Sequence, residues 1–453
     1  MNAKRLRALI VLLSLTHVLH AEEKFSPEIA ELVKNFSGRG ALGDKSPRPT
    51  PAESLAACKV GDGLALDLVA TEPMVRQPLN IHFDERGRLW VVQYLQYPFP
   101  AGMKVLRYDE YLRAVFDRTS PPPPNHFKGA DRITILESTK GDGVFDKAHD
   151  FLSDLNIARS VVTGRGGVWV LNPPHLLFYP DKNRDDIPDV MENGVAVPEV
   201  RLSGFGLEDT HSGANSLAWG PDGWLYGAHG STCTADVQGV KFLGQAIWRY
   251  HPVTRAFEIF AEGGGNTYSL EFDREGRIFS GTNGNQRGLH YPQGGAFVKN
   301  WGKHGPLMNP YSFGFFEHMA HKGDTRRFSQ SMAIYEGGAI PPLEGRFIAS
   351  MALTSRVLGT ALYRDTSTFR TEDGPPILES SNNWFRPVDT KVGPDGAIYI
   401  ADWCDSRLSH LDPRDTWDKE SGRIWRLRAA GMETKSESFD FAKMRPRTVH
   451  SMR

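Results

Sequence analysis

Residues 208–233 read EDTHSGANSLAWGPDGWLYGAHGSTC, and the expected architecture of the chain follows from this stretch. Its second half contains Asp222-Gly223, a dipeptide typical of tight turns because glycine tolerates the positive φ that such turns require. The residues after the turn alternate between aromatic and aliphatic side chains, as in a β-strand. We therefore predict a β-hairpin here. The first half places Asp209, His211 and Asn215 just before the hairpin.

The same turn-and-strand pattern recurs along the chain. The turn glycines of the later copies lie 57, 53, 69 and 51 residues apart, at Gly166, Gly223, Gly276, Gly345 and Gly396. A period of about 50 residues with about four short strands in each unit is typical of a β-propeller. We predict an all-β fold, a six-bladed β-propeller over residues 63–428. A pair of β-sandwiches is the alternative, and the fixed spacing argues against it.

The ends of this repeat array suggest how the ring closes. Residues 64–70 read as a first strand and are expected to pair with residues 423–427, which would leave no sheet edge open. The 79 residues between Gly87 and Gly166 indicate a proline-rich insertion in the first blade, over residues 94–129, that covers one face. Residues 429–453 are expected to form a C-terminal tail.

The N-terminus has the layout of a secretory signal. Lys4, Arg5 and Arg7 precede an apolar run that ends near Ala21, so residues 1–21 are predicted to be a signal peptide and residues 22–62 a linker with one short helix. No later segment is long and apolar enough to span a membrane. The mature protein is therefore expected in the periplasm or outside the cell. A formal net charge of −1 with interspersed charges gives no indication of nucleic-acid binding.

The three cysteines, Cys58, Cys233 and Cys404, are too few and too scattered for a disulfide framework or a zinc site, although one bridge would be compatible with export. The sequence has no Cys-x-x-Cys-His motif, so no covalent haem is expected on this chain.

One acidic segment has the spacing of a calcium-binding loop. Oxygen donors occupy positions 1, 3, 5, 9 and 12 of residues 181–192, and position 7 offers a backbone carbonyl. The predicted ligands are Asp181, Asn183, Asp185, Ile187, Asp189 and Glu192. The segment departs from the usual loop at position 6, where Asp186 replaces glycine. The alternative is a solvated acidic turn.

The candidate catalytic residues are His211 and Asp209. An imidazole facing the centre of a propeller can act as a general base near neutral pH, with the carboxylate orienting it. The alternative is a structural histidine that hydrogen-bonds a neighbouring loop. Asn266 follows Gly263-Gly264-Gly265, where the backbone can approach a ligand closely.

Four stretches resemble the propeller domain of the exported membrane-bound dehydrogenase proteins of the Planctomycetes–Verrucomicrobia group. They are LVATEPMVRQPLNIHFDERGRLWVVQYLQYPFP, EDTHSGANSLAWGPDGWLYG, FRPVDTKVGPDGAIYIADW and SGRIWRL, and the resemblance runs from about residue 63 to 427. Through that group the chain is distantly similar to the soluble quinoprotein glucose and sorbosone dehydrogenases. The resemblance implies pyrroloquinoline quinone (PQQ) in a central funnel, calcium, and a histidine base at His211.

The resemblance also implies cofactor contacts at Asn215, Asn266 and Arg386. The acid that follows the matching strand in the quinoproteins falls on Gly230, and their arginine before the asparagine falls on Gly265. Relatives in the group often continue into a cytochrome domain, whereas this chain stops soon after the propeller, so a separate electron carrier is expected. The resulting hypothesis is an exported dehydrogenase that oxidises a hydroxyl of a sugar or polyol. The alternative is a non-catalytic propeller that binds glycans or proteins and has lost its cofactor.

Overall fold

The computed structural model describes residues 24–38, 42–109, 113–281, 286–300, 306–326 and 331–432. The predicted signal peptide and most of the predicted tail lie outside the described residues. No helix in the described part of the chain is both long enough and apolar enough to cross a membrane.

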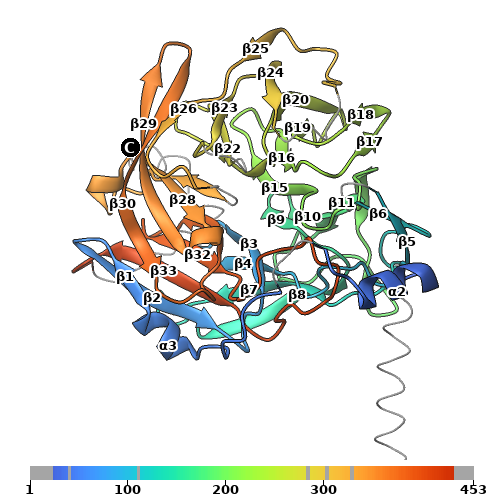
Figure 1. The fold of residues 1–453 in the computed structure, drawn as a ribbon, viewed down its shortest axis with the longest axis horizontal. Helices are drawn as coiled ribbons and strands as arrows, with labels where there is room; N and C mark the ends of the chain where they lie inside the picture. Colours follow the sequence, from blue (N-terminus) through green and yellow to red (C-terminus); the bar gives the residue numbers. More distant parts are fainter. Residues whose placement is uncertain are drawn as a thin grey trace, which may run out of the picture.

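The structure is nearly all-β, and its sheets are arranged around a common centre like the blades of a propeller (Figure 1). Three of the larger sheets are β3 (Pro78–Phe83), β4 (Leu89–Gln93), β7 (Asp131–Glu137) and β8 (Lys147–Leu155); β9 (Ser160–Thr163), β10 (Gly167–Asn172), β11 (His175–Pro180) and β14 (Glu199–Ser203); and β31 (Pro387–Val392), β32 (Ile398–Asp402), β33 (Arg423–Ala429) and β2 (Leu64–Thr71).

The other sheets depart from four strands. They are β15 (Ala214–Trp219), β16 (Leu225–His229), β19 (Ala246–Tyr250) and β20 (Phe257–Gly264), extended by β24 (Gly295–Lys299) and β25 (Gly314–Phe316); β21 (Tyr268–Phe272), β22 (Ile278–Gly281) and β23 (Leu289–Tyr291); and β27 (Met332–Ile334), β28 (Phe347–Met351), β29 (Arg356–Asp365) and β30 (Thr368–Ser380), with β1 (Cys58–Val60) and β26 (Ala320–Lys322) on β30. Within the described residues, five sheets thus have at least four strands and one has three.

Two-stranded ribbons and short helices complete the described elements. The ribbons are β5 (Val105–Tyr108) with β6 (Ala114–Phe116), β12 (Met191–Glu192) with β13 (Val195–Ala196), and β17 (Ala235–Val237) with β18 (Val240–Phe242). The helices are α2 (Pro27–Lys34), α3 (Pro51–Ala56), and the 3₁₀ turns η1 (Pro341–Leu343) and η2 (Ala352–Thr354).

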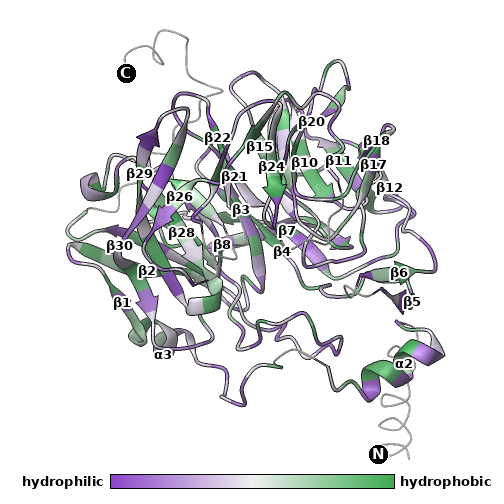
Figure 2. Cartoon of the chain, turned by 45° about the horizontal axis from the view of Figure 1, so that its top comes forward, coloured by the Kyte–Doolittle hydropathy of each residue, from purple (hydrophilic) through white to green (hydrophobic). Residues whose placement is uncertain are grey.

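The inner strands form a closed circuit of neighbours. β3 contacts β9, β9 contacts β15, β15 contacts β21, β21 contacts β27, β27 contacts β31, and β31 contacts β3 again. The hydrophobic core lies between neighbouring sheets rather than in one central mass; for example, Trp90 and Ile133 of one sheet pack with Val161 and Val168 of the next. In Figure 2 the strands β10, β11 and β24 are coloured mainly as hydrophobic, whereas the far end of β29 is hydrophilic.

The predicted closure of the ring is confirmed. β2 pairs antiparallel with β33, with Leu66 opposite Leu427. Because β2 comes from the start of the repeat array and β33 from its end, this one pairing joins the two ends of the array in a single sheet. Backbone hydrogen bonds that would otherwise be exposed at two sheet edges are thereby satisfied.

The predicted turns are also confirmed, and their conformation explains the repeated glycines. Gly166 has a φ of 81° and Gly223 one of 79°, in the left-handed region that favours glycine. The aspartate before several of these glycines caps the turn. Asp395 accepts the N–H of Ala397 and the hydroxyl of Tyr399, and Asp222 accepts the N–H of Trp224 and the hydroxyl of Tyr226.

The predicted linker over residues 22–62 is more ordered than expected. Helix α2 begins after Ser26, whose hydroxyl accepts the N–H of Ile29, and it buries Ile29 and Val33 beside β5. Both views place α2 at the margin of the molecule (Figures 1 and 2). Strand β1 pairs with β30. The proline and polar residues of this segment are typical of an irregular linker. The apolar face of α2 and the pairing of β1 with β30 nevertheless hold it against the rest of the structure.

We predict unequal effects of removing the turn aspartate in two blades. Asp395 pairs with Arg426 at 2.6 Å, with both side chains at most 3% exposed, whereas Asp222 pairs with Arg249 at 3.4 Å and is 38% exposed. Asp395→Ala should lower the free energy of unfolding by about 3–5 kcal/mol, because it leaves a buried guanidinium without this partner. Asp222→Ala should cost no more than about 1–2 kcal/mol. Denaturant unfolding of both variants would measure this difference, and equal losses would contradict it.

Candidate functional site

A cavity of about 600 Å³ lies where the inner strands of the ring begin. The starts of four inner strands contribute to its wall through Leu79 in β3, Asn215 in β15, Tyr268 in β21 and Val388 in β31. The insertion in the first blade and the loop between β32 and β33 supply further lining residues, namely Tyr94, Tyr97, Trp403, Arg407, His410 and Trp417. Segments that are far apart in sequence therefore meet in one cavity, which we call the hub cavity.

All the residues predicted for catalysis and cofactor binding line the hub cavity. These are His211, Asp209, Asn215, Asn266 and Arg386. The structure therefore brings together the five positions that the sequence singled out.

His211 lies between two other rings. Its Nδ1 is 3.1 Å from the hydroxyl oxygen of Tyr97. Its imidazole stacks on that of His410, with ring centroids 4.1 Å apart and planes inclined by 14°. Tyr97 comes from the first-blade insertion and His410 from the β32–β33 loop, so two distant segments fix the orientation of the predicted base.

Asp209 holds the backbone around this histidine. Its Oδ1 accepts the N–H of His211 at 2.9 Å, and its Oδ2 accepts the hydroxyl of Thr232 at 2.5 Å. The Nε2 of His410 is 4.0 Å from Oδ2. Burial acts to raise the pKa of Asp209, but His410, His211 and the hydrogen bonds outweigh it, so the pKa is lowered. Asp209 is therefore ionised at neutral pH.

The two asparagines, Asn215 and Asn266, differ in whether their side-chain oxygen already accepts a hydrogen bond. The Oδ1 of Asn266 accepts the hydroxyl of Ser212 and the N–H of Ser231. Asn215 donates to two backbone carbonyls, and its buried Oδ1 has no hydrogen-bond partner among the described residues. A Cβ at Gly230 would lie 2.7 Å from Asn266 Oδ1 and 2.6 Å from Ser212 Oγ, so an acid at this position would disturb this hydrogen bonding.

Arg386 is 4% exposed and is held by neutral groups. Its Nη1 donates to the hydroxyl of Ser355 at 2.9 Å and to the carbonyl of Ala352 at 3.3 Å. Burial lowers the pKa of Arg386 to about 10, against the opposing effect of Asp402 and Asp405. The side chain therefore remains charged at neutral pH inside the wall of the cavity.

Sequence reasoning missed four residues of this wall as members of the site, namely Tyr97, Arg159, Arg407 and His410. His410 and Arg407 lie in a segment dense in charged and aromatic residues, which is a weak signal because such segments are usually solvated loops. Arg159 immediately precedes an inner strand, at the place where Asp209 and His211 precede theirs, and that positional parallel could have indicated it.

The predicted calcium loop has a different arrangement from the one expected. The Asp181 carboxylate accepts the N–H groups of Asp185 and Asp186, and Asn183 donates to Asp185 rather than offering its oxygen. Asp189 accepts the N–H of Lys182. Within the described ranges, no group of three or more His, Cys, Asp or Glu side chains is arranged to hold a metal ion. The set Asp181, Asn183, Asp185, Ile187, Asp189 and Glu192 therefore does not fit calcium in this arrangement.

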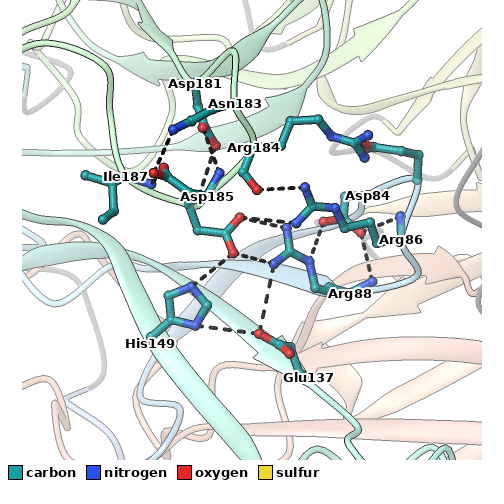
Figure 3. A network of polar contacts seen from close by, with 12 residues as sticks. Asp84, Arg86, Arg88, Glu137, His149, Asp181, Asn183, Arg184, Asp185 and Ile187 are labelled. Atoms are coloured by element: carbon teal, nitrogen blue, oxygen red, sulfur yellow. Dashed lines mark hydrogen bonds and ion pairs between the residues drawn. The ribbon is translucent and has the colours of Figure 1, made fainter. Parts of the chain in front are cut away.

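The physical reason lies at position 6 of that loop. Asp186 adopts the left-handed φ of 67° that glycine would otherwise supply. Its carboxylate leaves the loop and forms two bonds with the guanidinium of Arg88, at 2.6 and 2.9 Å. Arg88 also binds Asp84, the turn aspartate of the neighbouring sheet (Figure 3). The loop is thus an ion-paired bridge between two blades.

The fold and the hub cavity together define a propeller-like protein with a polar site at its centre. A sequence profile matches residues 50–431, and the chain therefore belongs to that family, which is described as a domain of unknown function (DUF7133). No curated protein matches the chain in sequence.

Several solved structures share the arrangement at low identity. One is a Thermus thermophilus protein described as a putative oxidoreductase (glucose dehydrogenase), with 17% identity and a TM-score of 0.46 over 81% of this chain and 100% of that one. Another is a Trichoderma reesei protein of the carbohydrate-active enzyme family AA12, with 12% identity and a TM-score of 0.48 over 83% and 97%. A third is the PQQ-bound aldose sugar dehydrogenase of Streptomyces coelicolor, with 14% identity and a TM-score of 0.41 over 82% and 99%. Likenesses this weak do not establish a shared activity.

We predict that a chelator leaves the melting temperature unchanged. The 181–192 loop is held by the Asp186–Arg88 pair and by its own backbone bonds, so metal removal should not weaken it. Thermal unfolding in calcium chloride and in EDTA would measure this, and a lower melting temperature in EDTA would restore the calcium hypothesis. Arg88→Met, in contrast, should lower the melting temperature in both buffers.

We predict that His229, next to the cavity, makes the protein less stable as the pH falls. His229 is fully buried between Phe205 and Phe242, and burial lowers its pKa from 6.5 to about 3. Between these values the unfolded chain binds a proton that the folded chain does not. The free energy of unfolding should therefore fall by about 1.4 kcal/mol per pH unit below pH 6.5.

The variant His229→Gln keeps an N–H that can donate to the Cys233 carbonyl, which accepts from the imidazole Nε2 at 3.0 Å. Denaturant titrations should show a smaller pH dependence for this variant. Phe242→Leu disturbs the same packing without removing a titrating group, so it should lower stability equally at every pH. An unchanged slope in His229→Gln would show that this histidine does not titrate as expected.

Proposed function

We propose that the hub cavity is the active site of an exported dehydrogenase-like propeller that oxidises a hydroxyl group of a sugar or polyol with a quinone-type cofactor. The observation that carries the proposal is the convergence of His211, Asp209, Asn266 and Arg386 on one cavity. The resemblance to the quinoproteins, which rests on sequence motifs alone, points to three of these positions, His211, Asn266 and Arg386. The likeness to sugar dehydrogenases agrees with the proposal but adds little weight to it.

The hub cavity fits a quinone such as PQQ in size and chemistry. Its volume of about 600 Å³ accommodates a flat fused-ring compound, and Tyr94, Tyr97 and Trp403 offer aromatic faces. The guanidinium of Arg386 would hold a cofactor carboxylate, and the unpartnered Oδ1 of Asn215 would accept an N–H. When bound, such a quinone supplies a two-electron acceptor.

The acid–base work falls to His211. If Nδ1–H donates to the Tyr97 oxygen, Nε2 carries no proton and can take the proton of a substrate hydroxyl. The ionised carboxylate of Asp209 would stabilise the positive charge that the imidazole then gains. Tyr97 and the stacked His410 keep the ring from rotating. Asp209 thus acts mainly through the backbone and through charge, not as the direct ring partner that the sequence suggested.

The wider features of the proposal follow from the sequence and the ring. Six blades are proposed, with β21–β23 as the fourth, and the closed circuit of inner strands supports this count. Residues 1–21 are proposed to direct export to the periplasm or beyond. A separate cytochrome-type carrier is proposed to take the electrons.

The activity assay uses the purified protein with PQQ, an artificial dye acceptor and a panel of neutral and acidic sugars and polyols. We expect dye reduction with at least one of them. His211→Gln should lower the turnover rate by about 10²–10⁴-fold, because a general base contributes about that much, while quinone binding is retained. His251→Gln, in the outer turn between β19 and β20, is the matched control and should leave the rate unchanged.

The outcome that would reject the dehydrogenase is clear. No dye reduction with any member of the panel, together with an unchanged melting temperature in the presence of PQQ, would exclude the reaction. Glycan binding that survives His211→Ala would then favour the non-catalytic alternative.

A further inference from the structure

The buried arginines of this protein fall into two groups. Among the described residues six arginine side chains are buried, and three of them lie away from the hub cavity and have carboxylate partners: Arg287 with Asp373 at 2.9 Å, Arg423 with Glu72 at 3.1 Å and Arg426 with Asp395 at 2.6 Å. The other three, Arg159, Arg386 and Arg407, line the hub cavity at exposures of 4%, 4% and 1%. Within the described part of the chain, none of these three has a carboxylate oxygen within 4.0 Å.

Neutral groups hold these three guanidinium groups. Arg407 donates to the carbonyl of Asp412 at 2.6 Å and to the hydroxyl of Thr416 at 2.9 Å. Arg159 donates to the carbonyls of Asp209 and Thr210. The Nε atoms of Arg159 and Arg386 are buried and have no hydrogen-bond partner among the described residues, which is also true of Arg423 in the ion-paired group, so the two groups differ in their carboxylate partners and not in Nε. Carbonyls satisfy part of the hydrogen-bonding capacity, and carboxylates such as Asp402 and Asp405 act on Arg386 only from beyond 4.0 Å. The charge is therefore compensated only in part, and burying such a charge is unfavourable.

The charge balance of the cavity wall is positive. Among the described residues that line it, Asp209 is the one carboxylate against the three guanidinium groups, and Asp402 and Asp405 act on Arg386 from outside the lining. The carboxylate of Asp209 is already engaged by Thr232 and by the N–H of His211. The cavity thus concentrates positive charge in a site with aromatic walls, which favours an anion.

The same wall limits the shape of that anion. Arg159 lies over the ring of Tyr94, with its guanidinium carbon 5.8 Å from the ring centroid, and Arg159 and Arg407 line the same cavity. The ring of Tyr97 lies between those of Tyr94 and Trp417, at centroid distances of 5.4 and 5.1 Å. Arg407 also stacks on Trp417, with the guanidinium carbon 4.4 Å from the ring centroid. Flat rings next to guanidinium forks are suited to a cyclic ligand that carries carboxylates, because arginine pairs with carboxylates in bidentate fashion.

We propose that the hub cavity binds a cyclic ligand bearing carboxylate groups, held by Arg159, Arg386 and Arg407. The proposal rests on the proposed function for the location of the site and does not depend on the redox step. The carboxylates can come from a quinone cofactor such as PQQ or from an acidic sugar such as a uronic acid. Arg159 and Arg407 then supply cationic groups in addition to Arg386. They would take the place of the arginine that the quinoproteins have at the position of Gly265 in this chain.

Equilibrium binding to the full chain distinguishes these sources. Isothermal titration would use PQQ, trigalacturonic acid and maltotriose, the last as a neutral trisaccharide. We expect at least one acidic probe to bind at least about tenfold more tightly than maltotriose, with an affinity that falls as salt is added. Binding of PQQ alone would identify a cofactor site, and binding of trigalacturonic acid alone would identify an acidic substrate. The proposal would be overturned if the unaltered protein bound maltotriose as tightly as the acidic probes, or if it bound neither acidic probe.

Substitution tests the residues. Arg386→Met and Arg407→Met should each lower the affinity for the acidic probe by about tenfold or more. Arg165→Gln, an exposed arginine at the opposite end of β9 from Arg159, is the control and should bind as the unaltered protein does. Binding that is unchanged in the two cavity variants would overturn the assignment of these side chains.

Stability without ligand separates a binding role from a structural one. If the cavity arginines are held for a ligand, Arg386→Met and Arg407→Met should keep or raise the melting temperature of the free protein, because they remove a buried charge that has no carboxylate within 4.0 Å. Arg426→Met, in the ion-paired group, should lower it. A cavity variant that lowers the melting temperature as much as Arg426→Met, with probe affinity intact, would show that its arginine only braces the loops. Probe binding without dye reduction would keep the anion site and reject the dehydrogenase.

Discussion

The pairing of β2 with β33 is the constraint on which the rest of the structure depends. It joins strands from opposite ends of the repeat array and so converts a series of local hairpins into a closed ring. Once the ring is closed, the sheet of β31–β33 lies beside the sheet that begins with β3. The β32–β33 loop then reaches the same cavity as the first-blade insertion, and His410 can stack on His211 beside Tyr97. The geometry of the candidate site is therefore a consequence of ring closure.

Between the blades, packing and ion pairs act together. Apolar side chains of neighbouring sheets form the cores, and aspartates at the turns fix the hairpins, while charged side chains such as Arg88 reach across to the next sheet. The Asp186–Arg88–Asp84 bridge shows how a sequence that looks like a metal loop can serve as such a connection. The partly buried guanidinium of Arg88 pairs with the carboxylate at position 6, which the loop spacing alone would direct at solvent or metal.

The buried arginines at the hub cavity have different partners from those in the rest of the molecule. Away from the cavity, buried arginines are matched by carboxylates, as in ordinary protein interiors. Around the cavity they are held by carbonyls and hydroxyls, and Asn215 leaves a buried oxygen without a partner among the described residues. Such a wall is less stable without a ligand than an apolar or ion-paired wall would be. Incomplete satisfaction of this kind is typical of sites where function has been favoured over stability.

How much of this could be predicted depended on whether the signal was local. Turn dipeptides, strand alternation and a regular spacing are properties of neighbouring residues, so the sequence determined the hairpins, their repetition and the strands that would close the ring. It also indicated His211, Asp209, Asn215, Asn266 and Arg386, because each lies in or beside a motif at or near the start of an inner strand. Only the tertiary structure decided that Tyr97, His410, Arg159 and Arg407 join them, that Asp186 turns away to Arg88, and that α2 and β1 hold the described part of the segment before β2. These outcomes rest on contacts between residues tens to hundreds of positions apart, and local preferences carry no information about which charges such contacts will pair and which they will leave facing a cavity.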